Sequence, residues 1–469
     1  MTHPAAQINK QHLEVTMIKS QKTTSKKSLP NQLSQMNPFA AGIDIGCHSH
    51  FVAAPIASGE IEVKEFLSIT SQLHVMSTWL KECKVTSVVM ESTGVYWIPL
   101  YELLESEGFE VKLVNARHVK NVTGRKTDVV DCQWLQQLHT CGLLSGAFRP
   151  QDKILPLRAY TREKQLIIIN INTHIARMHK ALATMNIKLS SVLSDITGLT
   201  GMQIIRAIVA GERDPAKLAM FRNERCKKNI KDIEEALRGN FREEHLYILK
   251  INLEAYDFCQ KQILDCDRQI EKTLHQLNPE SDDKKQDKSS QLKDPRCYKA
   301  KGGNASYFDP SEHLKAITGV DLLQIPGIQT NTAVKLISEI GVNMDPWKTA
   351  KHFTSWLGLC PENKISGGKQ LSSRSKPSAN QAAKSFRLAA FALCRSKTSL
   401  GAFFRRIQFK HGAAKAVTAT ARKIAVVFYN MLSKGSEYVE AGQERYEKQY
   451  KERVLSKVWQ KGQRSLDLL

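Results

Sequence analysis

The chain has 469 residues, 42% of them hydrophobic, which is enough for the cores of about two to four domains. Lysine and arginine total 68 against 46 acidic residues, so the net charge of +22 favours a polyanionic partner such as nucleic acid. No apolar run is long enough for a membrane span, and the ten cysteines include no Cys-x-x-Cys pair or zinc-type spacing. These features exclude a membrane-spanning protein and predict reduced thiols in a cytoplasmic one.

Residues 1–38 are polar and rich in lysine, glutamine and serine, which is typical of a disordered basic tail. The next stretch predicts an α/β domain over residues 39–150, because short β-branched runs alternate with helical patterns. The expected strands are 40–45, 51–56, 60–66, 85–90 and 110–114, and the expected helices are 71–83, 99–107 and 127–141. The first three strands are joined by turns so short that they must be antiparallel neighbours. Three meandering strands, then helix–strand–helix–strand and a closing helix, is the order of a ribonuclease-H-like fold.

Four acidic residues fall where that fold carries acids on its first strand, its fourth strand and its closing helix. Asp44 lies in Ala-Gly-Ile-Asp-Ile-Gly, and Glu91 follows the run Val-Val-Met. Asp128 and Asp131 are three residues apart and therefore share one helix face. An acid in a buried strand costs free energy unless it is paired or binds a cation. Four converging carboxylates would suit Mg²⁺, which prefers oxygen ligands.

Residues 151–277 are charged and mostly helical in pattern. Two apolar stripes with three- and four-residue spacing predict a helical hairpin or coiled coil, although an ordinary helical bundle fits equally well. The stripes are Leu166, Ile169, Thr173 and Ala176, and Ile263, Ile270, Leu274 and Leu277. Glycines and a proline between Asp195 and Arg238 predict a break in these helices. The polar run 278–312 predicts a flexible linker or surface insertion.

A mainly helical domain is expected over residues 313–438, followed by a charged helix or tail over 439–469. The segment Leu-Gln-Ile-Pro-Gly-Ile-Gln around Gly327 resembles a helix-hairpin-helix element, in which backbone amides of the second helix hold a phosphate. Gln329 stands in place of its usual second glycine, so a plain helix–turn–helix fits equally well.

Ser366 precedes Gly-Gly-Lys, which places a hydroxyl beside a flexible, positively charged turn. That setting would suit a nucleophile attacking a phosphodiester, but serine needs a base, a cation or a metal to activate it, and most such turns are plain loops. Basic residues crowd the stretch that follows, which favours phosphate contact over a merely solvated helix. The candidate nucleic-acid-binding residues are Gly327, Lys369, Arg374, Lys376 and Arg387.

Together these motifs resemble the transposases of the bacterial insertion-sequence one-ten family, also called DEDD transposases. The resemblance covers about residues 40–145 and 314–435. Its motifs, all in family order, are Gly-Ile-Asp44, Glu91-Ser-Thr-Gly-Val-Tyr-Trp, Lys-Thr-Asp128-Val-Val-Asp131, Ile-Pro-Gly-Ile, Leu-Gly-Leu-Cys-Pro, Ser366-Gly-Gly-Lys and Ala-Arg422-Lys-Ile-Ala. The chain departs from the family pattern at Gly46-Cys-His-Ser-His, where a lysine is usual, at 374–380 and in the insertion 278–312.

The resemblance implies a RuvC-like N-terminal domain, a dimerising coiled-coil linker and a C-terminal transposase domain with a nucleophilic serine. It implies that Asp44, Glu91, Asp128 and Asp131 bind Mg²⁺. Ser366 would form a transient phosphoserine bond with DNA, and Ser372, Ser373 and Ser375 lie close enough to be alternatives. The implied partners are the element ends and target DNA, a structured bridge RNA as guide, and further copies of the chain in a homodimer or tetramer. A bacterial, nucleoid-associated location in the cytoplasm follows.

Two other functions fit the same residues. A Mg²⁺-dependent junction resolvase or nuclease would use the four acids with water as the nucleophile. A non-enzymatic nucleic-acid-binding protein would use the acids only for structure. A covalent protein–DNA adduct separates the recombinase from the resolvase, and strand cleavage separates both from the binding protein.

Overall fold

The computed structural model describes residues 35–92, 94–115, 127–278, 306–378, 380–440 and 442–466. Residues 1–34 of the predicted basic tail and 279–305 of the predicted insertion lie outside these ranges. The chain divides into two compact units, Met1–Arg149 and Pro150–Leu469. No helix in the described part of the chain is both long enough and apolar enough to cross a membrane.

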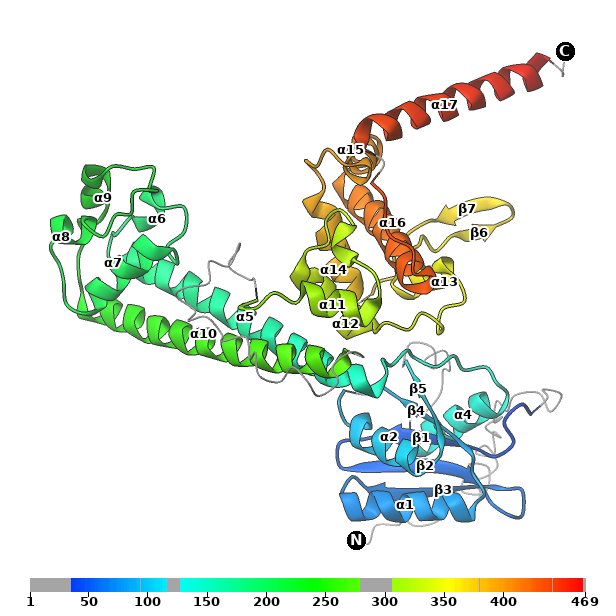
Figure 1. Cartoon of the computed structure of the whole chain (residues 1–469). Coiled ribbons are helices and arrows are strands. Elements are labelled where there is room, and N and C mark those ends of the chain that lie inside the picture. The colour runs from blue at the N-terminus through cyan, green and yellow to red at the C-terminus, as the bar shows by residue number, and fades with distance from the viewer. Residues whose placement is uncertain are drawn as a thin grey trace, which may run out of the picture. The chain divides into compact units, whose positions relative to one another are not determined.

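The first unit is built on a five-stranded mixed sheet in the order β3-β2-β1-β4-β5 (Figure 1). β1, β2 and β3 pair antiparallel, whereas β4 pairs parallel with both β1 and β5. The strands are β1 Ala40–Ile45, β2 Ser49–Pro55, β3 Ile61–Leu67, β4 Ser87–Glu91 and β5 Glu110–Val114. This is the predicted ribonuclease-H-like order, and the predicted ends of these strands fall within two residues of the observed ones. The predicted fold class is therefore confirmed.

Helices cover both faces of this sheet. α1 (Thr70–Glu82) and α2 (Trp97–Ser106) pack on the face that carries Ala41, Ile43 and Met90. α4 (Asp128–Thr140) packs on the opposite face, where Leu135 contacts Val89 and Val114. Side chains alternate along a strand. The residues of β1 and β4 that alternate with Ala41, Ile43 and Met90 therefore point to the opposite face, towards α4.

The second unit begins with two long antiparallel helices, α5 (Leu155–Thr184) and α10 (Glu243–Leu277), which we call the stalk (Figure 1). Between them the chain forms four short helices at one end of the stalk, which we call the tip bundle. They are α6 Leu189–Val192, α7 Leu199–Val209, α8 Pro215–Ala219 and α9 Ile230–Ala236. Of the two predicted arrangements, α5 and α10 form the helical hairpin. The tip bundle includes the stretch between Asp195 and Arg238, where glycines and a proline predicted a break in the long helices.

One of the two predicted stalk stripes is wrong. Leu166 and Ile169 are 56% and 59% exposed, and Ile167 and Ile171 pack against α10 instead. The run Leu-Ile-Ile-Ile at 166–169 offers apolar residues on more than one helix face, so spacing alone does not choose the packed face. The second stripe is confirmed, because Ile263, Ile270 and Leu274 on α10 are buried.

The rest of the second unit is a helical domain around an aromatic core. Phe353 packs edge-on against Phe386 and stacks on Phe428, and the Tyr429 hydroxyl donates to the backbone oxygen of Trp347 at 2.7 Å. The elements are α11 Ser311–Thr318, α12 Thr330–Ile340, α13 Ala350–Trp356, β6 Lys364–Ser366, β7 Lys369–Ser372, α14 Gln381–Ala392, α15 Ser399–His411, α16 Ala413–Lys434 and α17 Gln443–Leu466. Short 3₁₀ turns lie at Asp152–Ile154 and Leu322–Gln324.

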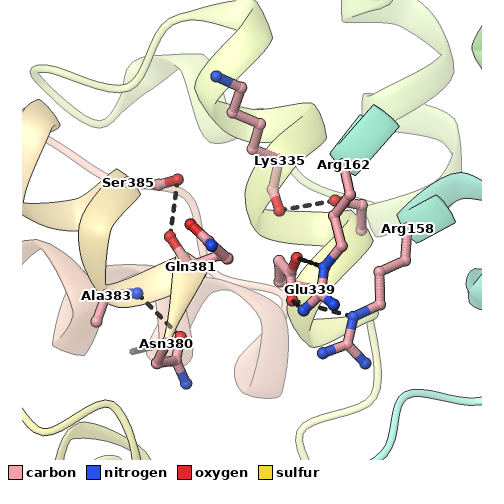
Figure 2. A network of polar contacts seen from close by, with 9 residues as sticks. Arg158, Arg162, Lys335, Glu339, Asn380, Gln381, Ala383 and Ser385 are labelled. Atoms are coloured by element: carbon pink, nitrogen blue, oxygen red, sulfur yellow. Dashed lines mark hydrogen bonds and ion pairs between the residues drawn. The ribbon is translucent and has the colours of Figure 1, made fainter. Parts of the chain in front are cut away.

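Buried ion pairs join the stalk to this helical domain (Figure 2). Glu339 on α12 is 6% exposed and accepts both guanidinium N–H groups of Arg162, at 2.7 and 2.9 Å. Arg158 lies one turn earlier on α5 and contacts the same carboxylate at 3.1 Å. Within the stalk, the fully buried Asp267 on α10 is paired with Lys164 on α5, which also donates to Ser306, ahead of α11. Charge-assisted bonds of this kind hold α5 and α12 in one orientation.

Candidate active site

Asp44 and Glu91 stand side by side at the carboxyl ends of two neighbouring parallel strands. The register pairs Ile43 of β1 with Met90 of β4, so the residues that follow them, Asp44 and Glu91, occupy the next level. Both side chains are partly buried. By the alternation of the strands, both face α4 rather than the core under α1 and α2. Two carboxylates held side by side offer oxygen ligands of the kind that a divalent cation binds.

α4 brings the other two acids to the same end of the sheet. The helix runs antiparallel to β1, because Cys132 lies over Gly42 and Gln136 donates from Nε2 to the Ala40 oxygen at 3.2 Å. Its first turn, with Asp128 and Asp131, therefore lies towards Asp44.

Thr127 caps α4 as predicted, because its hydroxyl accepts the Val130 N–H at 3.3 Å.

The pKa of a buried thiol agrees with the position of the first turn of α4 near Asp44. Burial raises the pKa of the Cys132 thiol to about 12, and the negative charges of Asp44 and Asp131 add to the rise. Because both charges act on one thiol, Asp44 on β1 and Asp131 in the first turn of α4 both lie near Cys132.

The four acids lie on elements that meet at one end of the sheet, but their carboxylates do not form a finished metal site. Within the ranges that the structure describes, no three acidic, histidine or cysteine side chains are grouped so that they could hold a metal ion. Asp128 is exposed, and residues 116–126, which lead into its helix, lie outside the described ranges. The donor chemistry fits Mg²⁺. Binding would require the side chains or the start of α4 to close on the ion.

Ser366 lies at the tip of the β6–β7 hairpin, which projects from the helices of its unit (Figure 1). It pairs with Lys369 across a two-residue turn. Gly367 and Gly368 have φ of +53° and +74°, and a primed hairpin turn needs this conformation at both positions. The Ser366 side chain is exposed, and no side-chain hydrogen bond to it occurs among the described residues. A serine nucleophile needs a base, a cation or a metal beside it, so a catalytic role for this exposed hydroxyl would require groups from outside the hairpin.

The other predicted nucleic-acid-binding residues are placed differently. Lys369 and Arg374 are exposed on or after the hairpin, and Lys376 is exposed with Glu362 at 3.6 Å. Arg387 is half-buried and donates to the Gly358 oxygen at 3.4 Å, so its guanidinium also braces the domain. These three exposed cations lie on the serine hairpin or shortly after it in sequence, and Lys376 has an acidic partner.

Gly327 has a packing role. A Cβ there would lie 2.5 Å from the Ala389 oxygen of α14, and the residue has φ of +88°. The turn between α11 and α12 is therefore pressed against α14. Gln329 gives α12 no side-chain cap, which leaves its first amides without a side-chain acceptor. This geometry suits both the helix-hairpin-helix and the plain helix–turn–helix interpretation.

One basic segment was not predicted as a functional surface. Arg225, Lys227 and Lys228 lie in the tip bundle, and their only signal in the sequence is a cluster of cations with few acids.

Two family models match the chain. Residues 41–187 match a transposase model of the DEDD, IS110 type, and residues 303–405 match the model described as the transposase IS116/IS110/IS902 family. The first range contains all four acids, and the second contains Ser366 and Gly327. None of the curated proteins compared with the chain matches it.

The ribonuclease-H-like sheet, the acids at its end and these matches define a transposase, an enzyme that cleaves DNA and transfers its strands. The two matched ranges together span more than half of the chain. The protein belongs to the IS110 family of transposases, and the predicted resemblance is confirmed.

Proposed function

We propose that this transposase exchanges DNA strands through a transient phosphoserine bond at Ser366, with Mg²⁺ bound by Asp44, Glu91, Asp128 and Asp131. The observation that carries the metal half is the β1–β4 register, which sets Asp44 beside Glu91 at the sheet end that the first turn of α4 approaches. The serine half is supported by the exposed hairpin tip and by its place in the second family match.

The chemistry of the serine step balances without a further reactant. Ser366 Oγ loses its proton to solvent and attacks phosphorus, while the bond from phosphorus to the leaving deoxyribose oxygen breaks and that oxygen takes up a proton. The phosphodiester energy is kept in the protein–DNA bond, so a hydroxyl of another strand can displace the serine. Mg²⁺, when bound, would polarise the phosphate and assist deprotonation of the hydroxyl. Lys369, next to the turn, would stabilise negative charge on the phosphate oxygens.

The partners of this reaction are DNA, which the family implies, and, as proposals, a structured guide RNA and further copies of the chain. The dimer or tetramer is supported by apolar residues on the outside of the stalk. Leu166, Ile169, Tyr247 and Phe258 are each more than half exposed, and exposed apolar surface of this kind marks an interaction site. We expect the enzyme at the nucleoid in the cytoplasm, where its DNA is.

The test is the covalent adduct between protein and DNA, seen as a slower band under denaturing electrophoresis. Ser366→Ala should abolish the adduct, whereas Ser373→Ala, at an exposed serine after the same hairpin, should retain it. An adduct on the Ser366→Ala protein would refute the serine assignment.

The same assay tests the acids and the resolvase alternative. Asp44→Asn removes a charge and keeps the shape of the side chain, so it should abolish cleavage without unfolding the unit. Full cleavage by Asp44→Asn would refute the metal assignment. Cut DNA without any adduct in the unaltered protein would favour the hydrolytic resolvase.

A further inference from the structure

A basic loop in the tip bundle, residues 222–231, has a conformation fixed by its own hydrogen bonds. Arg222 donates to the backbone oxygens of Lys228 at 2.6 Å and Cys226 at 2.8 Å, which ties the two ends of the loop together. The Asn223 N–H donates to the Thr200 hydroxyl on α7 at 3.0 Å. The loop is therefore ordered before any partner binds, which lowers the entropy cost of binding.

Asn229 is the N-cap of α9, so the last two residues of the segment 222–231 are already helical. Its side-chain oxygen accepts the Asp232 N–H at 2.7 Å, which caps the helix. Lys231 follows in the first turn of α9 and is exposed.

The loop presents cations that have no acidic partner. Arg225, Lys227, Lys228 and Lys231 are exposed, and among the described residues none of them forms an ion pair. Other tip-bundle cations differ, because Arg206 is paired with Asp257, Lys217 with Glu212 and Arg238 with Glu234. Residues 222–231 hold five basic residues and one acid, Glu224, so the loop keeps a net positive charge.

The amino-acid composition of the loop indicates which class of partner it would bind. Lysine is depleted in the cores of protein–protein interfaces, so exposed lysines of this density favour a polyanion. No aromatic residue occurs from 222 to 240. Of the two rings that flank this stretch, Phe241 is covered by the Arg213 guanidinium and Phe221 is 39% exposed, so at most one ring is open to an unpaired base. Several lysines and an arginine beside a single partly exposed ring suit the phosphates of a duplex, which carry no sequence information.

The length of the stalk fixes the distance between the basic loop and the helical domain that contains α12. α5 has 30 residues, and at 1.5 Å per residue it is about 45 Å long. Arg158 and Arg162, at its start, are bound to α12, and the tip bundle is at its other end. In duplex DNA that length corresponds to about 13 base pairs.

We propose that the basic loop at 222–231 binds the phosphate backbone of duplex DNA, as a second contact about 13 base pairs from the DNA held by the C-terminal helical domain. This contact would be independent of sequence and would orient the DNA that flanks the exchange site. It rests on the proposed function only in that the C-terminal helical domain holds DNA, and it does not depend on Mg²⁺ or on the serine chemistry.

The test compares two triple variants of the full-length chain. Arg225→Ala/Lys227→Ala/Lys228→Ala removes three loop cations. Lys250→Ala/Lys261→Ala/Lys272→Ala removes three exposed cations from α10 and is the matched control for net charge. The probe is a fluorescein-labelled duplex of arbitrary sequence, about 40 base pairs long, which is about three times the span of α5. Binding is measured by fluorescence anisotropy over a range of salt concentrations in the presence of a metal chelator.

The loop variant should bind the duplex at least about tenfold more weakly, and its slope of log affinity against log salt should be shallower by about 2 to 3. The control variant should change far less. Equal weakening of both variants would overturn the proposal. Weakening confined to a structured RNA hairpin, with DNA binding unchanged, would overturn it in favour of RNA.

Because all substituted side chains are exposed, both variants should keep the thermal midpoint of the unaltered chain. Lys231→Glu alone should also weaken duplex binding and provides a second measurement at a single position. Adduct formation is not part of this assay, so failure of the Ser366 assignment and failure of the loop assignment are separate results.

Discussion

At Gly42, the absence of a side chain sets how closely α4 approaches β1. A Cβ there would lie 2.4 Å from both the Cys132 oxygen and the Gln136 nitrogen of α4. The helix can therefore lie directly on β1, and this contact is what brings its first turn to Asp44. Sequence spacing placed Asp44, Glu91, Asp128 and Asp131 on the correct elements, but it did not reveal that one glycine controls the approach of the helix.

His139, on the last turn of α4, links the stability of the first unit to pH. It is 1% exposed, its Nε2 lies 2.7 Å from the Ser87 hydroxyl, and burial lowers its pKa to about 4, with Lys112 adding to the effect. The unfolded side chain takes up a proton near pH 6.5, whereas the folded one does so only near pH 4. The free energy of unfolding should thus be highest above pH 6.5 and fall by at most roughly 3 kcal/mol as the pH drops to 4.

Urea unfolding of the full-length chain at pH 7.5 and 4.5 measures this loss. His139→Gln, which cannot take up the proton, should lose less stability over the same interval. Burial also lowers the pKa of His50, so a smaller loss will remain in the variant. The same pH dependence in both proteins would show that His139 does not carry it.

At the scale of elements, the joint between α5 and α12 depends on Glu339. Glu339→Ala would leave Arg158 and Arg162 facing each other without their shared carboxylate. Because the two guanidinium groups are 26% and 47% exposed and water can solvate them, we expect a loss of about 1.5 to 3 kcal/mol, the range for hydrogen bonds to charged groups. We expect a lower urea midpoint and faster hydrogen exchange in α12.

Glu235→Ala is the control for this change. It removes an ion pair with Arg238 whose carboxylate is 74% exposed, so the loss should be below about 1 kcal/mol. Equal losses in the two variants would mean that burial adds nothing to the Glu339 contact.

Elements with one clear apolar pattern could be predicted, and those with two patterns or none could not. β1, β4 and β5 are short β-branched runs, and their predicted limits are close to the observed ones. The prediction of which face of α5 packs against α10 was wrong, because adjacent isoleucines place apolar side chains on more than one face of the helix. The β6–β7 hairpin was expected only as a turn, since its strands have three and four residues, nearly all of them exposed, and so lack a buried face to predict from.

At the scale of the whole molecule, the candidate residues belong to two units. The four acids lie in Met1–Arg149 and Ser366 lies in Pro150–Leu469. Topology predicted the acids, because a ribonuclease-H-like order allows few places for them. It did not predict the serine, which rests on resemblance, because an exposed Ser-Gly-Gly turn has no packing that marks it as catalytic. Whether one chain supplies both halves is a question of assembly, and local sequence patterns contain no information on it.

We predict that the acids and the serine of one site come from different chains of a dimer, because they belong to separate compact units and the stalk exposes apolar surface for a second copy. Asp44→Asn and Ser366→Ala proteins, each inactive alone, should then regain adduct formation when they are mixed and allowed to exchange subunits. In such a heterodimer one site combines two altered halves, and the other combines intact acids from the Ser366→Ala chain with the intact serine of the Asp44→Asn chain. With one protein carrying a size tag, the adduct should form only on the Asp44→Asn chain. If the mixture stays inactive although subunit exchange is complete, the acids and serine of a site belong to the same chain.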